Sequence, residues 1–150
     1  MNRIPAPALL LAVAGLIPFL WAALTALGLT SAADWNLPAV LGGDGRLLMV
    51  RYGGIILPFM AGTLWGFATR ATGGLAFAAY TASVAPALWW FFMPGTTAET
   101  ALINMAIGFA ALLLIEVAFD RWELTPPWWL AFRIQLTIVV LACIGIGIWA

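Results

Sequence analysis

Long apolar runs separated by short polar stretches dominate the sequence, and each run is about the 20 residues that a helix needs to cross a bilayer. The pattern predicts an all-α integral membrane protein, with residues 1–150 forming a single domain. A bundle of helices satisfies every backbone polar group inside lipid, so five transmembrane helices are the expected architecture. The approximate spans are 4–29, 46–68, 74–93, 97–119 and 130–150.

The first run resembles a secretory signal peptide, because the small residues Thr30-Ser31-Ala32-Ala33 follow it. Its apolar stretch is much longer than the roughly 7–15 residues of a signal peptide's apolar region. We therefore predict a retained transmembrane helix, with Pro18 as a kink. The connection over residues 31–45 is polar, with a short helical piece expected around residues 37–41.

Small residues recur every four positions in the second run, which we take as the centre of the bundle. Such residues fall along one ridge of a helix, and a ridge without bulky side chains lets a neighbouring helix approach closely in lipid. The alternative is that membrane helices simply carry more Gly and Pro than soluble ones. The third run has a similar spacing, so we expect the second and third helices to pack together along their small-residue faces. The predicted helix-packing residues are Gly54, Pro58, Gly62, Gly66, Ala78 and Ala82.

Tryptophan side chains gather near the ends of the runs, as is typical of membrane–water interfaces. Two consecutive prolines, Pro126 and Pro127, prevent the fourth helix from continuing into the fifth. The last tryptophan pair follows them and is expected to shield neighbouring charges. The predicted interfacial aromatic residues are Trp65, Trp89, Trp90, Trp128 and Trp129.

The arginines predict an orientation. Five crossings place the termini on opposite sides, and arginine accumulates on the cytoplasmic side of membrane proteins. A cytoplasmic N-terminus with the C-terminus outside gives four arginines inside and two outside. The inner four are Arg3, Arg70, Arg121 and Arg133, and the outer two are Arg46 and Arg51.

Glu116 is an ionisable residue within an otherwise apolar run, one helical turn before Asp120. Such a group is by default a functional candidate. The structural alternatives are pairing with an arginine and protonation. Arg70, Arg121 and Arg133 are expected at the same depth, so we predict a charge cluster in which Glu116 and Asp120 bind Arg70 or Arg133.

Composition narrows the function. The chain is 65% hydrophobic and 8% charged, with a formal net charge of zero, so it offers no basic surface for nucleic acid. It has no His and a single cysteine, Cys143. The chain therefore lacks the side chains that most often bind metals or act as catalytic bases and nucleophiles. We therefore expect no cofactor and no enzymatic activity. Arginine without lysine, together with much alanine, is typical of a GC-rich bacterial genome, so the expected location is the bacterial inner (cytoplasmic) membrane.

Three stretches together resemble one family. Residues 52–66 contain Tyr-Gly-Gly, then Pro-Phe, then Trp-Gly; residues 119–137 contain Phe-Asp-Arg followed by Pro-Trp-Trp; residues 4–19 open with Ile-Pro and end with Pro-Phe. These resemble the signatures of the transmembrane protein 69-like family. That family, found in bacteria and mitochondria, is a domain of unknown function, so the resemblance implies an architecture and no reaction. Where many members carry a basic residue before Trp-Gly, this chain has Leu64.

The leading functional hypothesis is non-catalytic: an accessory, assembly or stabilising subunit of a larger membrane complex, such as a respiratory or other energy-transducing one. Its expected partners are the lipid bilayer and other membrane-protein subunits. The alternative is binding or transport of a small apolar molecule, such as a quinone or lipid, in a pocket opened by Pro18 and Pro58 and lined by Trp65. A third alternative is an intramembrane enzyme that uses Glu116 together with the Asp-Arg pair after it.

Overall fold

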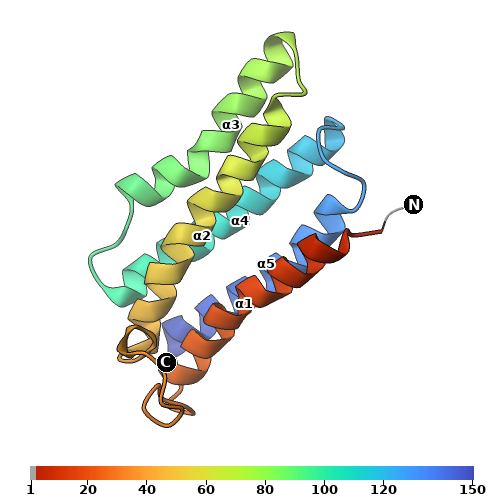
Figure 1. Cartoon of the computed structure of the whole chain (residues 1–150). Helices are drawn as coiled ribbons and strands as arrows, with labels where there is room; N and C mark the ends of the chain where they lie inside the picture. Colours follow the sequence, from red (N-terminus) through yellow and green to blue (C-terminus); the bar gives the residue numbers. More distant parts are fainter. Residues whose placement is uncertain (1–2) are drawn as a thin grey trace.

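The computed structural model describes residues 3–150 and contains five α-helices (Figure 1). Each is long and apolar enough to cross a membrane, and the described residues contain no strand. The predicted fold class, an all-α bundle of five membrane-spanning helices, is therefore confirmed. The helices are α1 (Ala6–Ala26), α2 (Gly45–Ala68), α3 (Gly73–Phe92), α4 (Ala98–Arg121) and α5 (Trp129–Trp149).

Local sequence sets the helix ends. The carboxylate of Asp44 caps α2 by accepting a hydrogen bond from the Arg46 amide at 2.8 Å. The first helix ends at Ala26 rather than at residue 29, because Gly28 has a φ of 69°, a left-handed conformation that a right-handed helix does not contain. The connection to α2 holds a short 3₁₀ helix, η1 (Ala39–Leu41), in the region where the sequence predicts a helical piece.

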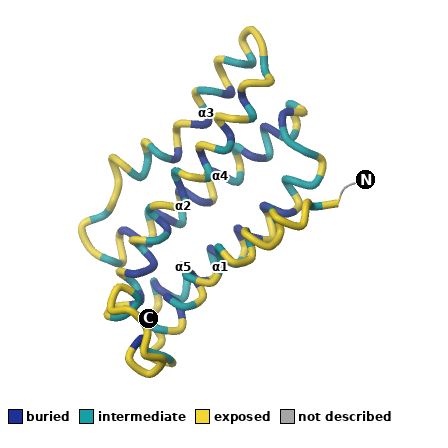
Figure 2. The backbone as a smooth tube through the Cα atoms, in the orientation of Figure 1, coloured by how far each residue is buried: buried dark blue, intermediate teal, exposed yellow. Residues whose placement is uncertain are grey.

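Helix α2 is the centre of the bundle, since it contacts all four other helices. Helix α3 packs against α2 and α4, whereas α1 packs against α2 and α5. Figure 2 shows that buried residues follow the inward faces of α2, α4 and α5, while α1 is exposed over most of its length. The core consists of large apolar side chains that are fully buried, among them Phe19, Met49, Leu57, Leu64, Leu102, Met105, Phe109 and Ile144.

The prediction that small residues of α2 form a packing ridge is wrong at the C-terminal end of this helix. Gly62 and Gly66 are exposed, and a Cβ atom added to either would meet nothing within 4 Å. Of the ridge's glycines, Gly54 does lie against a neighbouring helix, because an added Cβ would be 2.8 Å from the indole nitrogen of Trp90 on α3. Pro58, which belongs to the same ridge, is half-buried.

The buried faces of α2 and α3 are each displaced by one residue from the predicted ones. In α2 the buried ridge runs through Gly53, Leu57 and Ala61, one position before the predicted ridge. In α3 the buried residues include Ala79 and Ser83, one position after Ala78, which is exposed, and Ala82, which is half-buried. One residue is about 100° around a helix. The two helices therefore pack together, as predicted, but through neighbouring faces.

The backbones of α1 and α2 come into close contact at the start of α2. A Cβ atom on Gly45 would be 2.4 Å from the carbonyl oxygen of Ala22 and 2.4 Å from the amide nitrogen of Ala26. Both contacts are with backbone atoms, so no side-chain movement could relieve them. Glycine at this position allows the two helices to touch at this end of the bundle.

Candidate functional site

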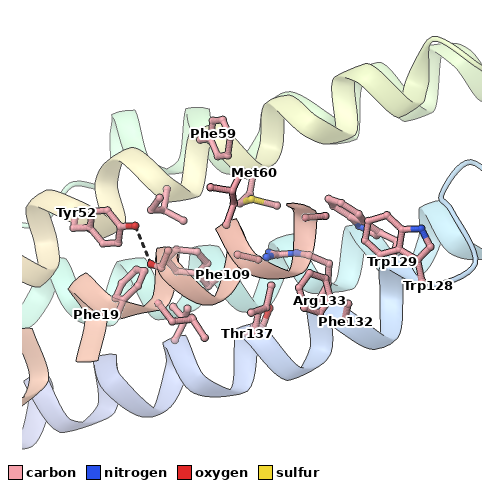
Figure 3. Close-up of a pocket in the computed structure, with 18 residues that line it drawn as sticks. Phe19, Tyr52, Phe59, Met60, Phe109, Trp128, Trp129, Phe132, Arg133 and Thr137 are labelled. Atoms are coloured by element: carbon pink, nitrogen blue, oxygen red, sulfur yellow. Dashed lines mark hydrogen bonds between the residues drawn. The ribbon is translucent and has the colours of Figure 1, made fainter. Parts of the chain in front are cut away.

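A cavity of about 370 Å³ lies between α1, α2 and α5 (Figure 3). Its volume falls in the range of roughly 300–1,000 Å³ that small-molecule sites occupy. Most of its walls are apolar or aromatic, and Phe109 of α4 closes it on the inner side. We treat it as the candidate site.

The cavity exists because α1 and α2 diverge. The two helices touch at Gly45 and then separate along their length, as Figure 1 shows. A second connection lies further along, where the Tyr52 hydroxyl donates a 2.8 Å hydrogen bond to the carbonyl oxygen of Gly15. The ring of Tyr52 packs edge-on against Phe19 at 5.1 Å, and Phe19 packs against Phe109 at 6.1 Å. These rings form the deep end of the cavity.

The opposite end of the cavity lies at the start of α5. Trp128 and Trp129 line it there, with their ring centroids 5.7 Å apart. Trp129 also packs edge-on against Phe67 of α2 at 4.9 Å. Tryptophan is typical of the headgroup region, so this end is expected at the membrane–water interface and the deep end near the middle of the bilayer.

One side of the cavity faces outward. Leu11 on α1 is 74% exposed and Phe59 on α2 is 67% exposed, and both line the cavity. Its other walls are buried in the bundle, as for Phe109 and Val140. A molecule dissolved in the bilayer could therefore enter sideways between α1 and α2.

The polar groups of the cavity come from α5. Arg133 and Thr137 are four residues apart, so they lie on the same ridge, and both line the cavity. They are 6% and 2% exposed. Figure 3 shows both side chains on the cavity side of α5. Burying polar groups is unfavourable unless they find hydrogen-bond partners, so the partners of these two residues decide what the cavity can bind.

Arg133 forms a buried ion pair with Glu116. Its Nε donates a 2.7 Å hydrogen bond to Oε1 of Glu116, which is completely buried on α4. The predicted pairing of Glu116 with Arg70 or Arg133 is therefore confirmed, with Arg133 as the partner. The pair joins α4 to α5 beside the cavity. It leaves Oε2 of Glu116 without a hydrogen-bond partner among the described residues.

The rest of the predicted charge cluster does not form. Arg70 donates a 3.2 Å hydrogen bond to the carbonyl oxygen of Leu124, and Asp120 accepts one of 3.2 Å from the Thr125 hydroxyl. Arg121 is exposed at the end of α4. None of the three charged residues forms an ion pair within residues 3–150. The turn after α4 brings Leu124 and Thr125 close enough to bond Arg70 and Asp120, so these charges stabilise the turn instead of one another.

The remaining predicted aromatic residues lie outside the cavity. Trp65 does not line it, contrary to the predicted pocket, and packs against Tyr80 of α3 at 4.7 Å. The indole nitrogen of Trp89 donates a 2.7 Å hydrogen bond to the carbonyl oxygen of Asn104. Trp90 covers Gly54. These three side chains join α3 to its neighbours.

Sequence reasoning missed most of the cavity lining, including two polar residues, Tyr52 and Thr137. A signal was available for both, since each is a polar side chain within a long apolar run, and Thr137 follows Arg133 by one turn. Within residues 3–150 no three His, Cys, Asp or Glu side chains gather into a metal-binding group. The cysteine Cys143 is buried. The chemistry that the described cavity offers is therefore apolar contact with a few hydrogen bonds.

A bundle of five apolar helices with an apolar cavity that faces outward defines a multi-pass membrane protein. The chain belongs to a family described as proteins of unknown function (DUF3429), whose sequence model matches residues 4–149. No curated protein and no solved structure matches the chain. The family therefore supplies no reaction, and the cavity is the basis for a functional proposal.

Proposed function

We propose that the protein binds a small, largely apolar molecule in the cavity between α1, α2 and α5, and that it does so without catalysis. The observation that carries this proposal is Thr137. Its side chain lines an otherwise apolar cavity, and its hydroxyl is buried without a hydrogen-bond partner among the described residues. A buried hydroxyl without a partner costs about 1–3 kcal/mol, so a bound molecule with an oxygen atom in the cavity would recover part of that cost.

The geometry also suits a ligand that arrives from the bilayer. The outward side between Leu11 and Phe59 faces the lipid, whereas the two ends are closed by rings. A carrier for water-soluble molecules would need a polar path through the membrane, and the cavity walls are mainly apolar. Binding of a lipid-soluble molecule therefore explains the arrangement better than transport of a soluble one.

Occupancy tests this proposal. The wild-type protein, purified in a gentle detergent, should retain an apolar small molecule detectable by native mass spectrometry. Ala12 lines the cavity, whereas Ala14 on the same helix is exposed and does not. Ala12→Phe should fill the cavity and expel the molecule, and Ala14→Phe should leave the occupancy unchanged. Equal occupancy in the two variants, or no bound molecule in the wild type, would refute the proposal.

A second proposal concerns the outward strip of α2. Gly62 and Gly66 leave open space above the helix, and such a strip lets another transmembrane helix approach closely. This supports a role as an accessory, assembly or stabilising subunit of a larger membrane complex, such as a respiratory one. Pull-down of tagged protein should then recover a stoichiometric complex, and Gly62→Leu with Gly66→Leu should release it without unfolding the chain. A complex that survives both substitutions would refute the role of this strip.

We propose the bacterial inner membrane as the location, with a cytoplasmic N-terminus and the C-terminus outside. The location is supported by a composition with arginine but no lysine and with much alanine, and the orientation by the arginine distribution, four against two. We also propose that the chain is related to the transmembrane protein 69-like family, which its sequence resembles. The proposed location and the proposed relationship are each consistent with a binding role and with a role as a subunit.

A further inference from the structure

The hydrogen-bond donors of the cavity lie along one ridge of α5. Trp129, Arg133 and Thr137 follow one another at four-residue intervals, and all three line the cavity. Arg133 uses only its Nε, in the bond to Glu116, and neither terminal nitrogen of its guanidinium has a partner within residues 3–150. The Thr137 hydroxyl is also without a partner there, whereas the Trp129 indole nitrogen lies beside the Glu116 carboxylate. The free donors of the ridge are therefore those of Arg133 and Thr137, and they call for a ligand that accepts hydrogen bonds.

The charge of the site favours a neutral acceptor. Glu116 already compensates the charge of Arg133, and the pair is buried. A carboxylate or phosphate in the cavity would leave a net negative charge on Arg133, Glu116 and the ligand together. Transferring such a charge into a region from which water is excluded is costly. A carbonyl oxygen accepts the same hydrogen bonds without that cost.

The side chains around the donors favour a flat ring. Trp128, Trp129 and Phe132 precede Arg133 at the start of α5, and all three line the cavity. Aromatic rings pack well against another planar ring, either offset or edge-on, with centroids roughly 4.5–7 Å apart. A fatty ester has the carbonyl oxygen but no ring to use these contacts. A ring that bears carbonyl groups satisfies the donors and the aromatic walls together.

The length of the cavity leaves room for an apolar tail. From Arg133 to Val140, which also lines the cavity, is seven residues, or about 10 Å along the helix. Leu136, Val140 and Phe19 line this deeper part and offer only apolar surface. A tail longer than this part of the cavity would leave through the outward side, between Leu11 and Phe59.

We propose that the cavity binds a quinone-type molecule, with a ring carbonyl oxygen accepting hydrogen bonds from Arg133 and Thr137 and the tail lying toward Phe19. This inference rests on the proposed function and names its ligand class. The ring lies nearer the interface, among the aromatic side chains, and the molecule enters from the bilayer between α1 and α2. Glu116 holds the guanidinium in place through Nε, so that its terminal nitrogens are directed to the ligand.

Matched probes test the ligand class on the full chain in nanodiscs of quinone-free lipid, with affinities measured by native mass spectrometry. Decyl-benzoquinone should bind at least about tenfold more tightly than decylbenzene, which has the ring and tail but no carbonyl, because hydrogen bonds to a charged donor contribute at this level. Decanoate tests an anionic head and methyl decanoate an ester carbonyl without a ring. Both should bind more weakly than the quinone.

Variants test the donors. Thr137→Val should weaken quinone binding about fivefold, the value of one hydrogen bond, and leave decylbenzene binding unchanged. Glu116→Met with Arg133→Met removes the pair without stranding a charge and should abolish the preference for quinone over decylbenzene. Thr81→Val, whose exposed hydroxyl bonds to Phe77 on α3, is the control and should change neither affinity.

The outcomes separate the inference from the function on which it rests. Equal affinity for quinone and decylbenzene would overturn the role of the donors while leaving apolar binding intact. Tighter binding of decanoate would assign an anionic ligand, and equal binding of methyl decanoate would assign an ester lipid, so either would overturn the quinone class. Failure of all four probes to bind would refute the proposed function itself.

Discussion

Removal of one partner of the Glu116–Arg133 pair should destabilise the protein far more than removal of both. Glu116 is 0% exposed, Arg133 is 6% exposed, and the atoms that join them are 2.7 Å apart. Glu116→Met leaves a buried guanidinium without its counter-charge, and Arg133→Met leaves a buried carboxylate. Breaking a buried pair in this way costs about 3–5 kcal/mol, whereas replacing both members by apolar residues of similar volume is often neutral or stabilising.

One carboxylate oxygen of the pair has no hydrogen-bond partner within residues 3–150, which strengthens the expectation that the double variant is stable. Only Oε1 of Glu116 is bonded, and Oε2 has no partner among the described residues. The double variant Glu116→Met with Arg133→Met removes that unsatisfied atom, so its free energy of unfolding should lie within about 1 kcal/mol of the wild type or above it.

Denaturant unfolding of the wild type, the two single variants and the double variant in mixed micelles, followed by circular dichroism, gives the four free energies for a double-mutant cycle. Arg121→Met is the matched control, because Arg121 is exposed and forms no ion pair within residues 3–150. It should change the stability by less than about 0.5 kcal/mol. Single variants as stable as the control, or a double variant that loses as much as the two singles together, would refute the reasoning.

Three further predictions concern packing, the cavity hydroxyl and topology. Gly45→Ala should cost about 2–3 kcal/mol of stability because its Cβ would collide with the backbone of α1, whereas Gly66→Ala, above which there is open space, should be neutral or slightly stabilising in the same denaturation assay. Equal effects of the two substitutions would contradict the close contact at Gly45. Thr137→Val should raise the stability of the ligand-free protein by about 1 kcal/mol, since it removes a buried hydroxyl without a partner, and a loss of that size would mean that the hydroxyl is bonded. Reporter fusions should place the α2–α3 and α4–α5 connections in the cytoplasm and the C-terminus at Ala150 outside, and a cytoplasmic Ala150 would exclude the predicted orientation.

The helices were predictable because each one is encoded locally. A run of apolar residues long enough to cross the bilayer, bounded by Gly, Pro or polar residues, needs no knowledge of its neighbours. The Glu116–Arg133 pair was predictable for a related reason: depth in the membrane follows from counting residues along two adjacent helices, and a buried charge needs a partner at the same depth.

Helix faces could not be predicted in the same way. In a soluble protein the buried face differs from the exposed face in polarity, but in lipid both faces are apolar, so the sequence carries little information on rotation. Gly62 and Gly66 therefore appeared to form a packing ridge, although the buried ridge lies one residue away, through Leu57 and Ala61. The cavity was not predictable, because it depends on the divergence of α1 from α2 in three dimensions.

Because the chain is made from its N-terminus, the Glu116–Arg133 pair should also affect how the helices insert into the membrane. The two residues are 17 positions apart, so α4 leaves the ribosome with its carboxylate before α5 supplies the guanidinium. An ionised carboxylate without a partner is costly in the bilayer core, so α4 alone should enter slowly or incompletely. We expect α4 and α5 to insert as a helical hairpin, whereas α3, which has no charged residue, can enter without waiting for the helix that follows it. A nascent chain that stops before Arg133 should therefore expose α4 to quality-control proteases.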